Sequence, residues 1–159
     1  MCEECKALTP QSFTLTYNNL EIDQHVYADF STDCYCKYCK KYTWHIDLEK
    51  NIAKVVRLLQ LHGFNTAHSC QGHDKFSNAC NQRIATAPYI AFYGNEILKY
   101  RMPLLRIEWV SEDYTANYEF DFDTAIRYRG EESEEAFEEA CSKLYKLLME
   151  LLIDHEKED

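Results

Sequence analysis

The sequence predicts an α+β fold, in which two helices pack on one face of an antiparallel or mixed sheet. Three observations lead to this prediction. Several short segments alternate apolar and polar residues, as strands do, and two longer segments repeat apolar residues every three or four positions, as helices do. The order along the chain is strands, helix, strands and a final helix. Near the N-terminus, two Cys-x-x-Cys pairs predict an additional metal-bound lobe.

The first 46 residues form this predicted N-terminal lobe, and residues 47–159 form the α+β domain; we expect one compact unit. In the lobe, Phe13, Leu15 and Tyr17 share one face of a predicted strand. Asn18 and Asn19 can turn the chain. Residues 20–23 and 25–30 are expected to return as strands.

The first helix of the domain is predicted over residues 47–62, with Asp47 as the N-cap and Gly63 as the terminator. Its apolar positions recur at helical spacing: Ile52, Val55, Val56, Leu59 and His62. Residues 64–69 then read as a strand. Tyr89–Tyr93 reads as a buried strand that Gly94 closes.

Two further strands are expected at Leu104–Val110 and Tyr114–Phe122, the second because aromatic and polar residues alternate along it. Ser133 is the predicted N-cap of a long final helix. Its apolar stripe comprises Phe137, Ala140, Cys141, Leu144, Leu147, Leu148, Leu151 and Leu152.

The two cysteine pairs, Cys2-x-x-Cys5 and Cys36-x-x-Cys39, have 30 residues between them. Two such turns can surround one ion with four thiolates, which is the closed tetrahedron that structural Zn²⁺ prefers. This pattern resembles a zinc ribbon over about the first 45 residues. We therefore predict one structural Zn²⁺ ion bound by Cys2, Cys5, Cys36 and Cys39. Cys34 or His45 is an alternative ligand.

A second constellation, His68-Ser69-Cys70-Gln71-Gly72-His73, has Cys80 further along the chain. Three interpretations stay open: a second metal site, a nucleophilic Cys70 with a histidine base, or a strand-to-loop turn in which Cys70 is buried and Gly72 permits the bend. The Gly-Phe-x-Thr-x-x-Ser-Cys-x-Gly pattern around it resembles small phage and mobile-element proteins. Residues 69–73 also resemble the Ser-Cys-Ser-Gly-Arg loop of the wybutosine-synthesis methyltransferase family, with His73 in place of the arginine.

The net charge is −10, and the acidic residues are concentrated in the last third of the chain. Residues 108–159 include 17 acidic and 5 basic residues, whereas residues 1–107 include 10 acidic and 12 basic residues. Such a surface repels nucleic acid and attracts basic partners. The predicted contact surface is the acidic segment, which comprises Glu131, Glu132, Glu134, Glu135, Glu138 and Glu139.

Small acidic α+β proteins with these features resemble anti-CRISPR inhibitors. That resemblance implies a non-enzymatic, phage-encoded protein that binds a Cas nuclease in the bacterial cytoplasm. One alternative is a metal- or thiol-dependent enzyme, methyltransferase-like or a hydrolase, centred on Cys70 and His73. Another is a zinc-ribbon nucleic-acid binder that uses Lys37, Lys40 and Lys41, although the net charge makes direct nucleic-acid binding unfavourable. No segment resembles a signal peptide or a membrane span.

Overall fold

A computed structural model of the chain describes residues 1–8, 15–17, 20–22, 31–36, 38–46, 48–72 and 87–158. In the strands that precede the first helix, only Cys36 and Lys41 have described side chains. In the part of the chain so described, no helix is long and apolar enough to cross a membrane.

The centre of the fold is a four-stranded sheet formed by β5 (Asn65–Cys70), β6 (Tyr89–Tyr93), β7 (Trp109–Asp113) and β8 (Thr124–Tyr128). The strand order is β5-β6-β8-β7, and all three neighbouring pairs are antiparallel. Successive side chains of a strand point to opposite faces of a sheet. In β6, Ile90 and Phe92 consequently face the main core. The strands predicted at 64–69 and 89–93 are confirmed.

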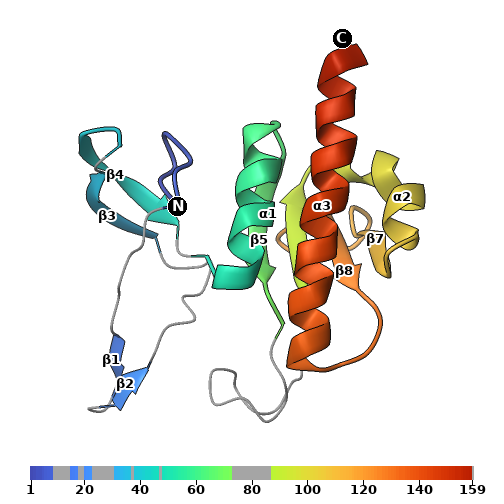
Figure 1. Ribbon diagram of the computed structural model, residues 1–159, viewed down its shortest axis with the longest axis horizontal. Helices are drawn as coiled ribbons and strands as arrows, with labels where there is room; N and C mark the ends of the chain where they lie inside the picture. The colour runs from blue at the N-terminus through green and yellow to red at the C-terminus, as the bar shows by residue number, and fades with distance from the viewer. Residues whose placement is uncertain are drawn as a thin grey trace.

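Two helices, α1 (Lys50–Leu61) and α3 (Glu134–Glu158), lie side by side over one face of this sheet (Figure 1). The predicted α+β architecture is therefore confirmed. Trp109 is fully buried beneath α3, where its indole Nε1–H donates to the carbonyl oxygen of Ala140 over 3.2 Å. Most helical residues in the core have the predicted spacing, among them Ile52, Val55, Val56, Leu59, Phe137, Leu144 and Leu148. Leu58 joins the core in addition, whereas the predicted His62 is the C-cap residue of α1 and is only half-buried.

Both helices begin close to their predicted starts. The α1 helix has Glu49 as its N-cap residue, while the predicted cap, Asp47, lies outside the described residues. Gly63 ends α1 with φ of +87°, a conformation that glycine adopts without steric cost. At α3, the Ser133 hydroxyl accepts a hydrogen bond from the Ala136 N–H over 3.1 Å, which confirms the predicted cap.

The strand predicted at Leu104–Val110 is wrong. This region forms the 3₁₀ helix η1 (Glu96–Tyr100) and the short helix α2 (Arg101–Leu105), and β7 begins only at Trp109. Ile97, Tyr100 and Leu104 are all buried, and their spacing of three and four is helical. Two of these three residues precede Leu104, so the helical spacing could not be recognised within the predicted strand segment alone.

The strand predicted at Tyr114–Phe122 is also wrong, because these residues connect β7 to β8 as a loop. Asp113 and Asn117 side chains accept backbone N–H groups two residues further on, which favours turns over a strand. Three aromatic rings of the loop, those of Tyr114, Phe120 and Phe122, pack on one another at centroid distances of 4.9 to 5.3 Å. The aromatic residues that alternate along this segment therefore pack on one another within the loop, and they do not form one face of a strand.

The N-terminal lobe contains two small hairpins. Strands β1 (Leu15–Tyr17) and β2 (Leu20–Ile22) pair as expected, whereas the strand predicted at 25–30 lies outside the described residues. Strands β3 (Ser31–Cys36) and β4 (Lys41–Ile46) form a second antiparallel hairpin that the sequence analysis missed. Its turn carries the second cysteine pair, so the fold places that pair at a hairpin end.

A candidate four-cysteine metal centre

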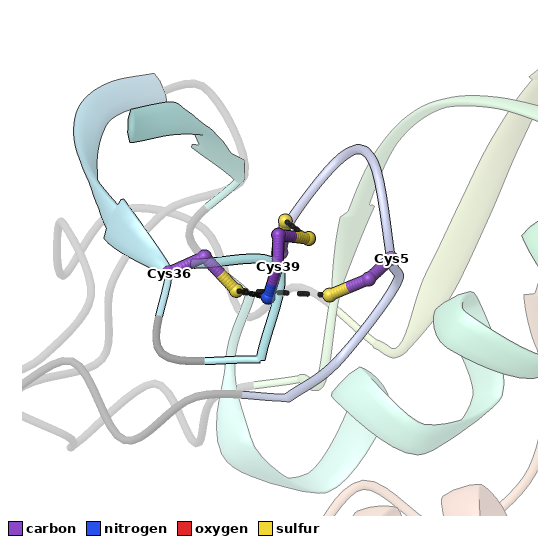
Figure 2. A group of neighbouring side chains, drawn as sticks. Cys5, Cys36 and Cys39 are labelled. Carbon is purple, nitrogen blue, oxygen red and sulfur yellow. Dashed lines mark hydrogen bonds between the residues drawn. The ribbon is translucent and has the colours of Figure 1, made fainter. Parts of the chain in front are cut away.

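The four predicted metal ligands, Cys2, Cys5, Cys36 and Cys39, come together in the folded chain. Their Sγ atoms all lie within 4.8 Å of one another. Cys2 and Cys39 are 3.8 Å apart at sulfur, and Cys5 and Cys36 are 3.7 Å apart (Figure 2). A disulfide bond would require about 2.0 Å, so these are separate thiols.

These separations match the geometry of a tetrahedral zinc site. With Zn–S bonds of about 2.3 Å, the sulfur atoms of a regular tetrahedron are about 3.8 Å apart. Both of these distances join a cysteine of one pair to a cysteine of the other, as four ligands of a single ion require. The residues present therefore fit a mononuclear site with no open coordination position.

Each cysteine pair lies in its own backbone turn, and the two turns are of the same type. The N–H of Lys6 donates to the Cys2 carbonyl over 2.9 Å, and the N–H of Lys40 donates to the Cys36 carbonyl over 2.7 Å. Both lysines have φ of +60°, in the left-handed region that closes such a turn. In the second turn, the Cys39 N–H also points to the Cys36 sulfur over 3.4 Å (Figure 2). Local structure thus directs both sulfur atoms of each pair to one point.

The neighbouring sulfurs change the acidity of Cys39. Hydrogen bonding to the Cys5 sulfur, followed by burial and the other two sulfurs, raises the pKa of Cys39 to about 12. Without a metal, the Cys39 thiol consequently keeps its proton near neutral pH. A bound divalent ion would replace the protons of its thiol ligands with its own charge, so its affinity should fall in acid.

The lobe is connected to the domain through the first cysteine turn. The Lys6 ammonium donates to the Gln60 Oε1 over 2.9 Å, and the Arg57 Nε–H donates to the Lys6 carbonyl over 2.8 Å. Glu4 and Lys41 form an exposed ion pair between the two cysteine turns. These contacts fix the candidate metal centre against α1.

The alternative ligands have backbone positions only. Cys34 lies on β3 opposite Thr43, and His45 lies on β4 opposite Thr32. Their side chains lie outside the described part of the chain. Among the described residues, the four-cysteine group is the one set of histidine, cysteine and acidic side chains close enough to hold a metal ion.

The second predicted constellation is divided by the limits of the described residues. His73 and Cys80 lie outside them, while His68 and Cys70 lie on β5. The Gly72 N–H points to the Cys70 sulfur over 3.4 Å. Gly72 has φ of +86°, and a Cβ there would approach the Pro88 side chain to 2.6 Å. These contacts support the interpretation of this segment as a tight turn, although Cys70 is half-buried and not buried as expected.

His68 is held by its neighbours on the sheet face opposite the main core. Its Nδ1 lies 3.2 Å from the Tyr89 hydroxyl, and its ring packs edge-on against Phe122. The Asp121 carboxylate is 3.6 Å from its Nε2. Sequence reasoning found no acidic partner for this histidine, because Asp121 is 53 positions further along the chain.

The acidic segment is accessible. All six of its glutamates are exposed, and they flank or form the first turns of α3. Negative charge at a helix N-terminus is favourable because the backbone N–H groups there carry partial positive charge. Glu139 pairs with Lys143 over 3.3 Å, one turn further along the helix. The segment is therefore a stable, exposed acidic surface.

The lysines considered for nucleic-acid binding are less available for phosphate contacts than the alternative required. Lys40 is exposed, but Lys41 is already paired with Glu4, which raises the pKa of the Lys41 ammonium. Lys37 lies outside the described residues.

The sequence analysis did not single out Glu108 and Tyr128, which lie beside the acidic segment. Glu108 has φ of +66°, and the Tyr128 hydroxyl is hydrogen-bonded to its carboxylate. Gly130, two residues after Tyr128, was a possible signal in the sequence, since glycine often stands where other groups approach the backbone closely.

Fold and site together define an α+β protein with a candidate four-cysteine metal centre. No protein-family model, curated protein sequence or solved structure matches this chain.

Proposed function

We propose that this protein is a non-enzymatic, zinc-stabilised inhibitor that binds a basic protein partner through the acidic segment of α3. The partner class that we propose is a CRISPR-associated nuclease, which the protein would block from loading nucleic acid or from cleaving it. A phage origin and action in the cytoplasm of the bacterial host belong to the same proposal.

Support for the zinc part comes from the sulfur geometry. The distances of 3.7 and 3.8 Å fit a single tetrahedral ion, and four thiolates would complete its coordination. Such an ion stabilises a fold and leaves no position for a substrate or an activated water molecule. Its role would accordingly be structural.

The observation that carries the binding part is the exposure of all six glutamates of the acidic segment. A dense negative surface accelerates association with a positively charged partner and disfavours nucleic acid. Nucleases that hold guide and target strands present positively charged channels, to which such a surface is complementary. An acidic protein in that channel would compete with the phosphate backbone.

The test is inhibition of DNA cleavage by a panel of CRISPR nucleases, with and without the purified protein. We expect stoichiometric inhibition of at least one nuclease, and a loss of about tenfold or more in affinity when the six glutamates are changed to lysine. The triple variant that changes Glu132, Glu135 and Glu138 of the segment to lysine is compared with a charge-matched control, in which three exposed glutamates elsewhere, Glu96, Glu119 and Glu150, are changed to lysine. Inhibition by this control should persist. Equal inhibition by the six-lysine variant would contradict the proposed contact, and inhibition of no nuclease would contradict the proposed partner class.

A further inference from the structure

A cavity of about 220 Å³ is lined by residues from the first turns of α3, from the segment just before β7 and from the end of β8. Its apolar lining comes from Ile107, Ala136 and Ala140. Its carboxylates come from Glu108, which precedes β7, and from Glu131 and Glu139 of the acidic segment. The cavity thus combines an aliphatic surface with three acidic groups, two of which belong to the proposed contact surface.

The carboxylate of Glu108 is fixed in place by its neighbours. The Arg129 N–H donates to the Glu108 carbonyl over 2.8 Å. A Cβ on Gly130 would lie 2.4 Å from the Tyr128 hydroxyl oxygen and 2.6 Å from a Glu108 carboxylate oxygen. The absence of a side chain at Gly130 therefore lets these two polar groups meet at the cavity.

Tyr128 adds a buried polar group to the lining. It is 7% exposed, and its hydroxyl donates to Glu108 and accepts from the Glu131 backbone N–H. Burial, and then the charge of Glu108, raise the pKa of the Tyr128 hydroxyl, which stays protonated as a donor. That hydrogen bond orients the Glu108 carboxylate, which can accept further hydrogen bonds.

The charge of the cavity calls for a cation. Lys143 is the basic residue in its lining and already pairs with Glu139 over 3.3 Å. The Arg129 guanidinium is directed to Glu112 instead, over 2.8 Å. Three carboxylates against one ammonium leave a net charge of about −2 at neutral pH. A neutral apolar ligand would remove water from these carboxylates without replacing their hydrogen bonds.

We infer that this cavity binds an arginine side chain of the basic partner. The aliphatic stem of arginine would pack on Ala136, Ala140 and Ile107, and its planar guanidinium would donate to Glu108 and Glu131. A bare divalent cation would make no use of the aliphatic lining. This inference rests on the proposed function, because it specifies which group of the partner enters the acidic surface.

The test uses a small probe and needs no partner protein. The ¹⁵N-labelled full-length protein is titrated with N-acetyl-arginine amide, with its uncharged analogue N-acetyl-citrulline amide, and with N-acetyl-lysine amide. We expect weak arginine binding, with Kd of about 1 mM, and shift changes confined to the cavity residues. Both other probes should bind about tenfold more weakly. Citrulline lacks the positive charge, and lysine lacks the planar fork of N–H donors.

Variants locate the binding. Glu108→Gln should weaken arginine binding about tenfold, because it removes a charged acceptor. Glu150→Gln is the matched control, since Glu150 is exposed on the same helix but lies outside both the cavity and the acidic segment. It should leave binding unchanged. Ala136→Leu should fill the cavity and abolish binding, while its unchanged amide spectrum elsewhere reports an intact fold.

Each outcome bears on the inference. No arginine binding, equal binding of citrulline or lysine, or equal losses in Glu108→Gln and Glu150→Gln would overturn it. Arginine binding without inhibition of any nuclease would support the cavity assignment and contradict the proposed function. Nuclease inhibition without arginine binding would retain the proposed function and remove the cavity from it.

Discussion

At the scale of single residues, burial decides the chemistry of the cysteines. Cys141 is 1% exposed, and its Sγ lies 3.9 Å from the Gln71 carbonyl oxygen. Burial, followed by the charges of Glu49 and Glu138, raises its pKa from 9.0 to about 12. A thiol in such surroundings is unreactive and serves as a small core residue. The apolar stripe in the sequence predicted this position, but it carried no information about the two nearby carboxylates.

This shift predicts a pH dependence of stability. Between pH 9.0 and about 12, the Cys141 thiol is ionised in the unfolded chain and protonated in the folded one. Unfolding then releases a proton, so this group makes stability fall as pH rises, by at most about 1.4 kcal/mol per pH unit. Urea unfolding of the wild type and of Cys141→Ala, at several pH values from about 8 to 10, measures the difference. If stability fell equally with pH in the two proteins, the pKa of Cys141 would not be raised by folding, and the prediction would be wrong.

At the scale of elements, local sequence signals decided where α1 ends and where α3 begins, but they did not predict every helix or strand. The Ser133 cap and the Gly63 terminator act within one turn of the chain, so both were predictable. The alternation at Tyr114–Phe122 was misleading because its rings pack on one another within a loop. Tyr118, at the middle of that loop, is 98% exposed and contributes nothing to a buried strand face.

The Ser133 cap gives a prediction for α3. Ser133→Ala removes the acceptor for the Ala136 N–H and should lower the free energy of unfolding by about 1 kcal/mol. The matched control is Ser142→Ala, because Ser142 is exposed in the interior of the same helix. Alanine has the higher helix propensity, so this change should be neutral or slightly stabilising. Chemical denaturation of both variants makes the comparison. Equal effects would mean that the cap is energetically silent.

At the scale of the whole molecule, the chain has two different sources of stability. Among the described side chains, the main hydrophobic core contains residues from Ile52 to Leu152 and none of residues 1–46. The buried ones among the described side chains of residues 1–46 are Met1, Cys2 and Cys36. These three bury little apolar area, so we expect a bound metal ion to stabilise the described part of the lobe.

Metal removal should therefore affect the two parts unequally. A strong chelator at neutral pH should release one Zn²⁺ ion per chain and increase amide exchange in residues 1–8 and 31–46. The helical circular dichroism of α1 and α3 should persist, because their core is independent of the lobe.

Native mass spectrometry of two variants provides the control. Cys36→Ser should lose the ion, whereas Cys70→Ser, which changes a cysteine outside the cluster, should retain it. A metal-free wild type, or the mass of iron in place of zinc, would contradict the zinc assignment. Global unfolding on chelation would contradict the independence of the core.

The sequence by itself determined the fold class, the two long helices and the cysteine ligand set. These rest on periodicity and short-range spacing, which act within a few residues: Ile52, Val55 and Leu59 repeat along α1, and each Cys-x-x-Cys turn directs its own sulfurs. Only the tertiary structure decided how distant segments meet. It placed Cys2 3.8 Å from Cys39, set Asp121 beside His68, and brought Glu108 to Tyr128 and Glu131 around one cavity. Such contacts depend on strand order and on packing between elements, and the spacing of residues along one chain carries little record of either.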